Sequence, residues 1–304
     1  MEVKTNPKRS IVQSALTGVI LGFTALFCII FGGFPLLLLL MSIIFLGSKE
    51  YVQILQHKGF YPSLKVILIF NTIIALLAYF DCMNLMPLVF TFGLITSFMW
   101  VLFKGRQPYI ANVATTLLGF VYCGWCPLQM LFLRDLGTTN NTSYMQMIFK
   151  TNILSAGLGY VVFLLLLVIM TDIGCYYSGK FFGKHKLAPV ISPNKTIEGA
   201  IGGAIAAIIL GMVCGYFMGL PWYHSFIMGS LVTVFAQIGD LSESLLKRDA
   251  GVKDSGDLLP GHGGFLDRTD SYILTIPVLY YYCLYFVQSN DLMNSIIAFV
   301  KGIF

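Results

Sequence analysis

Four acidic residues form two closely spaced pairs in the C-terminal half of the sequence. Asp240 and Glu243 are three residues apart, and so are Asp267 and Asp270. In a helix this spacing places both side chains on one face, so the members of each pair can act together. Carboxylate oxygens are the ligands that Mg²⁺ prefers. The two pairs therefore indicate a divalent metal site.

Basic residues are interleaved with these acids, at Lys247, Arg248, Lys253 and Arg268. Lysine and arginine bind phosphate oxygens through charge-assisted hydrogen bonds. Carboxylates and cations together thus predict a site for a metal and phosphates. The alternative interpretation is a purely structural network of salt bridges, because such networks also cluster charges.

A glycine-rich stretch, Gly261-His262-Gly263-Gly264, lies between the two acidic pairs. Glycines let the backbone approach a ligand closely and expose N–H groups to anions. We expect His262 to donate to a phosphate oxygen, and the alternative is a solvent-exposed histidine without a role. The sequence contains no Walker A motif and no G-x-G-x-x-G in a βαβ context, so the common soluble phosphate motifs are not used.

A second polar segment runs from Asp172 to Glu198 and contains Lys195 and Ser192-Pro193-Asn194. Ordinary loop charge on the cytoplasmic side explains its lysines. It does not explain why Asp172 and Glu198 lie at the edges of apolar runs. Ionisable residues at such positions are costly and are functional candidates.

The elements that must position these residues are transmembrane helices. Of the 304 residues, 57% are hydrophobic and 11% are charged, with a mean hydropathy of +0.80, whereas about a quarter of a soluble chain is charged. The composition predicts an all-α polytopic membrane protein. An N-terminal region, 1–150, would hold about five spans, and a catalytic region, 151–304, would carry cytoplasmic segments 172–198 and 244–270. The nine expected spans are 11–31, 34–47, 64–80, 86–103, 110–133, 152–171, 199–219, 221–245 and 269–288.

Lysine and arginine predict the orientation. With the N-terminus in the cytoplasm, nine spans place every basic residue except Arg134, Lys150 and Lys301 on the cytoplasmic side, as the positive-inside rule requires. The basic residues are scattered over these loops, which argues against nucleic-acid binding. Residues 49–60, with Lys49 and Glu50 among apolar side chains, predict a short helix on the membrane surface.

Two further patterns concern turns and cysteines. Gly32 and Gly33 predict a tight reversal between the first two spans. Cys123 and Cys126 have C-x-x-C spacing, but they lie inside an apolar run without a βαβ context. We therefore expect them to pack as small hydrophobic residues rather than to bind a metal or form a redox centre.

Residues 244–270 closely resemble the signature of the phosphatidate cytidylyltransferase (CDP-diacylglycerol synthase) family. The matching run is Ser244-Leu-Leu-Lys247-Arg248-x4-Lys253-Asp254-x-Gly256-x2-Leu259-Pro260-x-His262-Gly263-Gly264-Phe265-x-Asp267-Arg268-Thr269-Asp270. Gln237-Ile-Gly239-Asp240 before it, and parts of 172–199, are also similar to that family. The N-terminal spans match only in general character.

The resemblance implies transfer of CMP from CTP to phosphatidic acid, with release of pyrophosphate and with Mg²⁺ as cofactor. The metal aspartates of the family fall on Asp240 and Asp267, and a second cation such as K⁺ is compatible with the family. From position we further expect Asp270, Glu243 and Asp172 near the metal. The remaining expectations are that Lys247, Arg248, Lys253 and Arg268 bind phosphates, that Gly263 and Gly264 donate N–H groups to pyrophosphate, and that Lys195, Ser192 and Asn194 contact CTP.

The expected partners are CTP, phosphatidic acid and the bilayer, with a homodimer left open, and the expected location is a bacterial inner membrane with the active site facing the cytoplasm. The nearest alternatives are a CTP-dependent polyprenol or phytol kinase and an ether-lipid cytidylyltransferase. A transporter would place its acids near the bilayer midplane, whereas here they cluster at one edge. A scaffold without catalytic activity is the remaining alternative.

Overall fold

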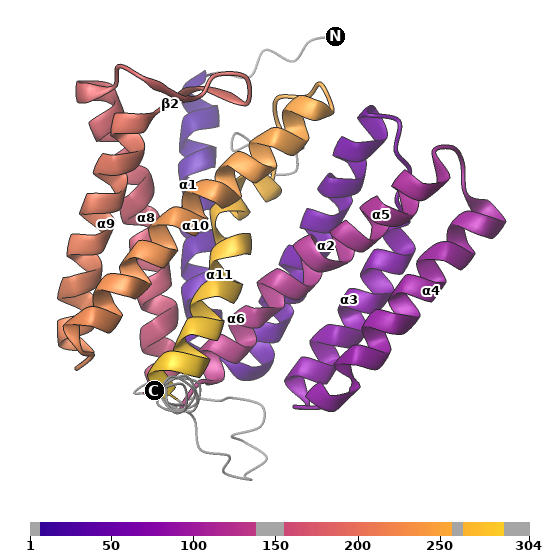
Figure 1. Cartoon of the computed structure of the whole chain (residues 1–304), viewed down its shortest axis with the longest axis horizontal. Helices are drawn as coiled ribbons and strands as arrows, with labels where there is room; N and C mark the ends of the chain where they lie inside the picture. Colours follow the sequence, from indigo (N-terminus) through magenta and orange to yellow (C-terminus); the bar gives the residue numbers. More distant parts are fainter. Residues whose placement is uncertain (1–6, 138–154, 257–263, 289–304) are drawn as a thin grey trace, which may run out of the picture. The chain divides into compact units, whose positions relative to one another are not determined.

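The computed structural model describes residues 7–137, 155–256 and 264–288, and these are mostly helical (Figure 1). Six helical segments among them are long and apolar enough to cross a membrane, which confirms a helical integral membrane protein. The count of nine spans stays a prediction, because the apolar helical stretches Gly18–Phe31 and Leu64–Tyr79 are shorter than a full span. The six segments are Gly33–His57, Met83–Lys104, Tyr109–Asp135, Ala156–Phe182, Ile197–Phe217 and Trp222–Asp249.

The chain forms two compact units, and their boundary falls inside helix α10 (Trp222–Asp249). Unit 1 consists of Met1–Leu131, Asn141–Ile153 and Glu243–Asp270. Unit 2 consists of Phe132–Asn140, Leu154–Ser242 and Ser271–Phe304. The segment that carries the family signature therefore belongs to the unit of the N-terminal helices, although it is more than 100 residues away from them in sequence.

Unit 1 is built on helices of the N-terminal half, to which the end of α10 and a 3₁₀ turn, η3, are added. These helices are predominantly apolar, as expected for helices in lipid. The reversal between the first two helices occurs at Gly32 and Gly33, whose φ angles of 61° and 50° confirm the predicted tight turn. The elements are α1 (Pro7–Phe31), α2 (Gly33–His57), α3 (Leu64–Tyr79), η1 (Met83–Leu85), α4 (Met86–Lys104), α5 (Tyr109–Phe120), the π-helix η2 (Val121–Trp125), the start of α6 (Cys126–Asp135) and η3 (Leu266–Arg268).

Helix α2 corrects one sequence prediction. The short span 34–47 and the surface helix 49–60 are a single helix of 25 residues that ends at His57. Nothing between Gly47 and Tyr51 breaks the helix, and this stretch is buried rather than lying on a surface. The prediction was wrong because the charges of Lys49 and Glu50 were read as a solvent-facing pattern. The Glu50 side chain is instead fully buried.

Contacts between α2, α3 and α5 form the core of unit 1. The Tyr51 hydroxyl donates to the Thr115 carbonyl at 2.9 Å, and the Phe70 and Phe120 rings meet edge to face, 6.1 Å between centroids. A Cβ at Gly119 would stand 2.7 Å from both the Tyr51 ring and the Ile67 side chain. A small residue is thus required there for α5 to approach α2 and α3.

Unit 2 contains a pair of closely packed helices, α8 and α9, and a short hairpin that joins them. Figure 1 shows α8 and α9 side by side along their length. The two-stranded sheet is the one departure from the predicted all-α fold among the described residues. The elements are the end of α6, α8 (Ala156–Phe182), β1 (Lys186–Ala188), β2 (Ser192–Thr196), α9 (Ile197–Phe217), α10 as far as Ser242, α11 (Asp270–Tyr282) from Ser271, and the π-helix η4 (Cys283–Gln288).

Small residues allow α8 and α9 to pack closely. A Cβ at Gly174 would lie 2.8 Å from the Cα of Gly203, and a Cβ at Gly203 would lie 2.4 Å from the Cys175 Sγ. Close backbone approach through small residues is a common way for helices to associate in a membrane. Helix α10 is tied to the pair by a 3.2 Å hydrogen bond between the Thr171 and Thr233 hydroxyls.

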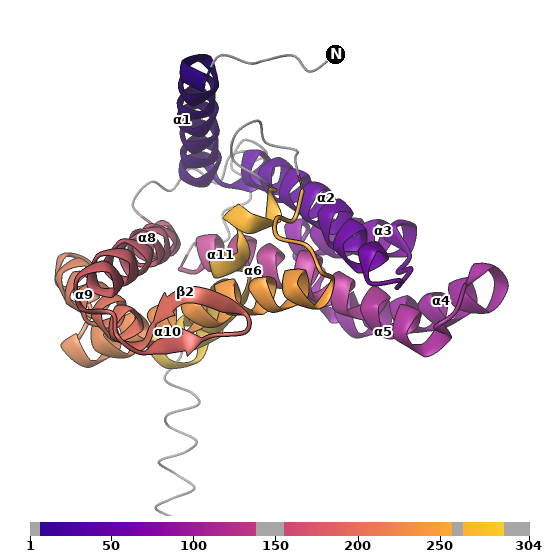
Figure 2. The same ribbon diagram turned by 90° about the horizontal axis from the view of Figure 1, so that it is seen from above.

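The hairpin is fixed at the start of α9. Strands β1 and β2 are antiparallel, with Lys186 opposite Thr196 and an irregularity before Ala188. The Thr196 hydroxyl accepts from Gly199 N at 3.1 Å and so caps α9. Figure 2 shows the two helices nearly end-on with the hairpin across their ends. This arrangement holds Lys195, at the end of β2, beside the adjacent ends of α8 and α9.

The C-x-x-C cysteines behave as predicted from their context. Cys123 lies in the π-helix η2 and Cys126 begins α6, and both side chains are buried with free thiols. No cluster of three or more metal-ligating side chains occurs in the described parts of the chain. Their burial agrees with packing as small hydrophobic residues within an apolar segment.

Candidate active site

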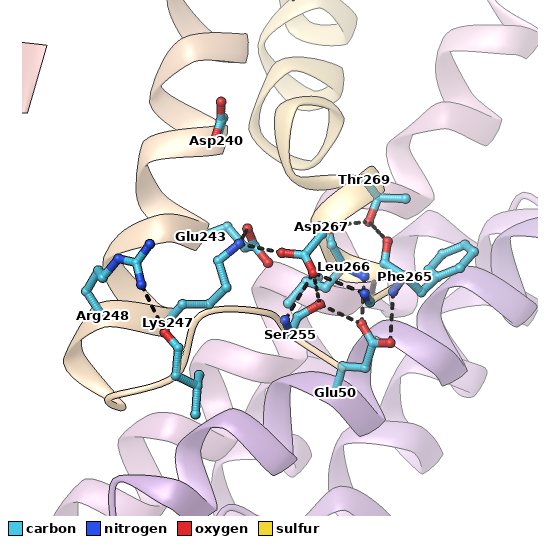
Figure 3. Close-up of polar contacts among 12 residues, drawn as sticks. Glu50, Asp240, Glu243, Lys247, Arg248, Ser255, Phe265, Leu266, Asp267 and Thr269 are labelled. Carbon is cyan, nitrogen blue, oxygen red and sulfur yellow. Dashed lines mark hydrogen bonds and ion pairs between the residues drawn. The ribbon is translucent and has the colours of Figure 1, made fainter. Parts of the chain in front are cut away.

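The first charged cluster lies in unit 1, at the end of α10 and in the segment that follows it (Figure 3). We call this segment loop 250–269, of which the structure describes residues 250–256 and 264–269. Lys247, in the last turn of α10, forms ion pairs with Glu243, one turn earlier, and with Asp267 on η3. The Lys247 Nζ lies 2.6 Å from the Glu243 Oε2 and also contacts the Asp267 Oδ1. The structure thus brings together three of the residues predicted from the sequence.

Asp267 is held by donors on both of its oxygens. Its Oδ2 accepts hydrogen bonds from the Ser255 N–H at 3.0 Å, the Ser255 hydroxyl at 2.9 Å and the Gly264 N–H at 3.1 Å. Partial burial raises the pKa of this carboxyl, but the Lys247 ammonium and the Ser255 donors outweigh burial and lower the pKa to about 2. Asp267 is therefore an anion at any physiological pH.

Glu243 is fully buried, and neither of its oxygens accepts a hydrogen bond from the described residues. Its charged neighbour is the Lys247 ammonium, which forms an ion pair with the Oε2 atom at 2.6 Å. A buried carboxylate normally has donors on its oxygens, because an unsatisfied one is expensive. Glu243 and Asp267 thus offer hard oxygen atoms around one cationic position, a donor set that suits Mg²⁺.

Sequence reasoning missed two residues of this cluster, Ser255 and Glu50. The Glu50 carboxylate accepts from the Phe265 N–H at 2.8 Å, the Leu266 N–H at 2.7 Å and the Ser255 hydroxyl at 3.0 Å (Figure 3). The two N–H groups belong to the start of η3, where backbone donors have no partner within the helix. A signal was present in the sequence, because Glu50 shares a helical face with Gly47 and Ile54.

The second charged cluster lies in unit 2. The Lys195 ammonium forms an ion pair with the Asp240 carboxylate, and Asp172 lies within electrostatic range of both. These three residues come from β2, α10 and α8. The structure therefore joins the two predicted polar segments of unit 2, 172–198 and the end of the eighth span, in one cluster.

The two acidic pairs differ from their predicted geometry. Asp240 and Glu243 are three residues apart in α10, as expected, but they belong to different units. Asp267 and Asp270 do not share an α-helix, because Asp267 lies in the 3₁₀ turn η3 and Asp270 is the first residue of α11. Thr269 separates the two elements. The spacing i, i+3 was therefore a wrong guide to a common helix face for this pair.

The other predicted site residues lie on α10, on the segment that follows it and on β2. Arg248 donates to the Val252 carbonyl at 3.4 Å, and Lys253 and Arg268 are exposed. Ser192 and Asn194 lie on β2. The N–H of Gly264, expected to donate to pyrophosphate, donates to Asp267 in the structure. His262 and Gly263 lie outside the described residues, so their roles stay predictions.

These features define a class of protein, an integral membrane protein with lysine–carboxylate clusters suited to metal and phosphate chemistry. The chain matches the model of the cytidylyltransferase family over residues 12–286, and it therefore belongs to this family of nucleotide-transferring enzymes.

Relatives support the same assignment. The chain is 33% identical over 282 residues to the phosphatidate cytidylyltransferase of Synechocystis sp., covering 89% of this chain and 94% of that protein. It is 33% identical over 285 residues to the phosphatidate cytidylyltransferase of Bacillus subtilis, covering 88% and 96%. A similarly named protein of Staphylococcus aureus is 50% identical over 127 residues, which are 41% of this chain and 49% of that protein.

Proposed function

We propose that the chain is a phosphatidate cytidylyltransferase, which converts CTP and phosphatidic acid into CDP-diacylglycerol and pyrophosphate. The observation that carries the proposal is the alignment of nearly the whole chain with relatives of that name. In the reaction, a phosphate oxygen of phosphatidic acid bonds to the α-phosphorus of CTP. The bond from that phosphorus to the oxygen bridging to the β-phosphate breaks, and pyrophosphate leaves with the electron pair.

The membrane fold suits a lipid substrate of this kind. Taking acyl chains out of the bilayer costs about 0.8 kcal/mol per CH₂, so the nucleotide must come to the lipid. The distribution of lysine and arginine supports nine spans with a cytoplasmic N-terminus, and with them a site at the cytoplasmic edge of the cell membrane. CTP is available on that side.

We assign the acidic residues of both clusters to cation binding. Glu243 and Asp267 would hold Mg²⁺ in unit 1, and the full burial of the Glu243 carboxylate beside a cation supports this. Asp240, Asp172 and Asp270 are further candidate ligands, and a second cation such as K⁺ fits the same chemistry. When bound, Mg²⁺ neutralises phosphate charge and orients the attacked phosphorus.

The basic residues would bind the phosphates. Lys247 and Lys195 already contact carboxylates that suit a cation, so their ammonium groups lie where phosphate oxygens would approach. Exposed Lys253 and Arg268, together with Arg248, would hold the triphosphate or the lipid phosphate, and Ser192 and Asn194 would contact CTP. The chain then acts by positioning and charge neutralisation, and no covalent intermediate is required.

The decisive experiment measures both products. We expect the purified protein in phosphatidylcholine vesicles, supplied with dioleoyl phosphatidate, CTP and Mg²⁺, to form pyrophosphate and CDP-diacylglycerol in equal amounts. A CTP-dependent lipid kinase would release CDP instead. Formation of CDP in place of pyrophosphate would reject the proposal. So would a protein that consumes CTP without releasing pyrophosphate.

A further inference from the structure

The buried Glu50 carboxylate connects helix α2 with loop 250–269, which is about 200 residues later in the sequence. None of its side chain is exposed. Burying a carboxylate is costly unless its oxygens receive hydrogen bonds. Here one oxygen accepts from the Phe265 N–H, and the other accepts from the Leu266 N–H and the Ser255 hydroxyl. The cost of burial is thus offset only while the loop stays against α2.

Ser255 links Glu50 directly to Asp267. Its hydroxyl lies 3.0 Å from the Glu50 Oε2 and 2.9 Å from the Asp267 Oδ2, while its N–H donates to the same Asp267 oxygen. A hydroxyl carries one proton and can therefore serve only one of the two carboxylates at a time. The orientation of Asp267 consequently depends on where Glu50 holds Ser255.

Two glycines allow the loop to reach Glu50. A Cβ at Gly264 would stand 1.8 Å from the Ser255 Oγ and 2.9 Å from the Glu50 Oε2, and a Cβ at Gly256 would stand 3.0 Å from the Glu50 Oε1. A side chain at Gly264 would force the loop away from the carboxylate. Packing alone therefore explains why these two positions are glycines, whether or not a ligand binds nearby.

We propose that Glu50 is a positioning residue that holds Ser255 and the start of η3, and through them orients the Asp267 carboxylate toward its ligand. The catalytic part of this inference rests on the proposed function, whereas the anchoring of the loop does not. Residues that orient a metal ligand by hydrogen bonds typically change metal affinity or activity 10–100-fold when replaced. Glu50 would belong to that class.

The experiment compares Glu50→Gln with Asp81→Asn. Both replace a carboxylate by its amide, but Asp81 is exposed in the turn after α3, where asparagine tolerates the φ of 58°. Hydrogen exchange of the metal-free protein is followed by mass spectrometry. We expect exchange at Ser255 and residues 264–268 to rise at least about tenfold in Glu50→Gln and not in Asp81→Asn. The Mg²⁺ concentration for half-maximal CTP turnover should rise by about 10–100-fold.

Ser255→Ala provides a second variant that removes one donor and little volume. If Glu50 and Ser255 act together, Glu50→Gln/Ser255→Ala should lose no more activity than Glu50→Gln alone, because coupled residues are not additive. Additive losses, or unchanged exchange in 264–268 of folded Glu50→Gln, would overturn the inference. Faster exchange in a protein whose wild type makes no pyrophosphate would support the anchoring and reject the proposed function.

Discussion

Lys247 and Asp267 form an ion pair although they are 20 positions apart in the sequence. This contact joins η3 to the last turn of α10. Glu243 contacts the same ammonium from one turn earlier, so a single lysine serves two carboxylates. The stability of the cluster and its proposed chemistry therefore both depend on Lys247. Substitutions at Lys247 and Glu243 can separate the effect on stability from the effect on activity.

Lys247→Gln should reduce both stability and activity. It leaves the buried Glu243 carboxylate without a countercharge, and breaking a buried ion pair on one side costs about 3–5 kcal/mol. We expect a lower unfolding temperature in detergent and loss of CTP turnover. Lys58→Gln is the matched control, because Lys58 pairs with Asp249 at an exposed site, where such pairs contribute about 1 kcal/mol or less.

The double variant Lys247→Gln/Glu243→Gln should recover most of the stability but none of the activity. Removing both charges relieves the uncompensated burial, whereas phosphate binding still lacks its cation. A double variant that unfolds as easily as Lys247→Gln would contradict this account of the cluster.

Asp267→Asn should reduce CTP turnover by more than about 100-fold, the upper end of the effect of groups that merely orient a metal ligand. The amide has the same shape, and its oxygen can still accept from Ser255 and Gly264, so the fold should persist. Pyrophosphate release and the unfolding temperature are measured together. Turnover equal to that of Asp81→Asn would show that Asp267 has no part in the reaction.

Much of the fold could be predicted from the sequence, because apolar length and loop charge are strong signals for membrane helices. The extent of α2 could not, since a lone charged pair at Lys49 and Glu50 resembles the end of a span. Only the packing of loop 250–269 shows that Glu50 faces inward. Whether a charged residue on a helix is buried depends on the groups that contact it, and for Glu50 these groups are about 200 residues away in the sequence.

The candidate site was predicted as a set of residue types but not as a set of contacts. Asp267, Glu243 and Lys247 were all expected in it. That the lysine would lie between the two carboxylates could not be read from spacing, because Asp267 is placed by a 3₁₀ turn rather than by a helical repeat. The role of Gly264 likewise depends on the tight approach of Ser255.

Lys195→Gln should raise the KM for CTP more than it lowers kcat. Lys195 lies at the end of β2 and pairs with Asp240, so its loss removes a cation from the second cluster without disturbing the α8–α9 contact. Lys184→Gln is the control, since it changes an exposed lysine of the same connection. Equal kinetic constants for the two variants would show that Lys195 takes no part in nucleotide binding.

Gly203→Ala should destabilise the α8–α9 pair. The added Cβ would lie 2.4 Å from the Cys175 Sγ and 2.8 Å from the Thr171 carbonyl oxygen, and overpacking of this kind typically costs about 1–3 kcal/mol. The unfolding temperature in detergent is the measurement. Gly22→Ala is the control, because a Cβ at Gly22 meets nothing within 4 Å. Equal unfolding temperatures would argue against close packing of these helices.

The proposed orientation predicts which surface cysteines react from outside the cell. Cys82 is exposed between α3 and η1, and a cytoplasmic N-terminus followed by three crossings places this turn outside. In a variant that keeps only Cys82, a membrane-impermeant maleimide added to intact cells should label the protein. A cysteine at exposed Lys58, after two crossings, should react only in broken cells. Because each additional or missing crossing exchanges the two results, the opposite pattern would reject the cytoplasmic N-terminus or the count of the first three spans.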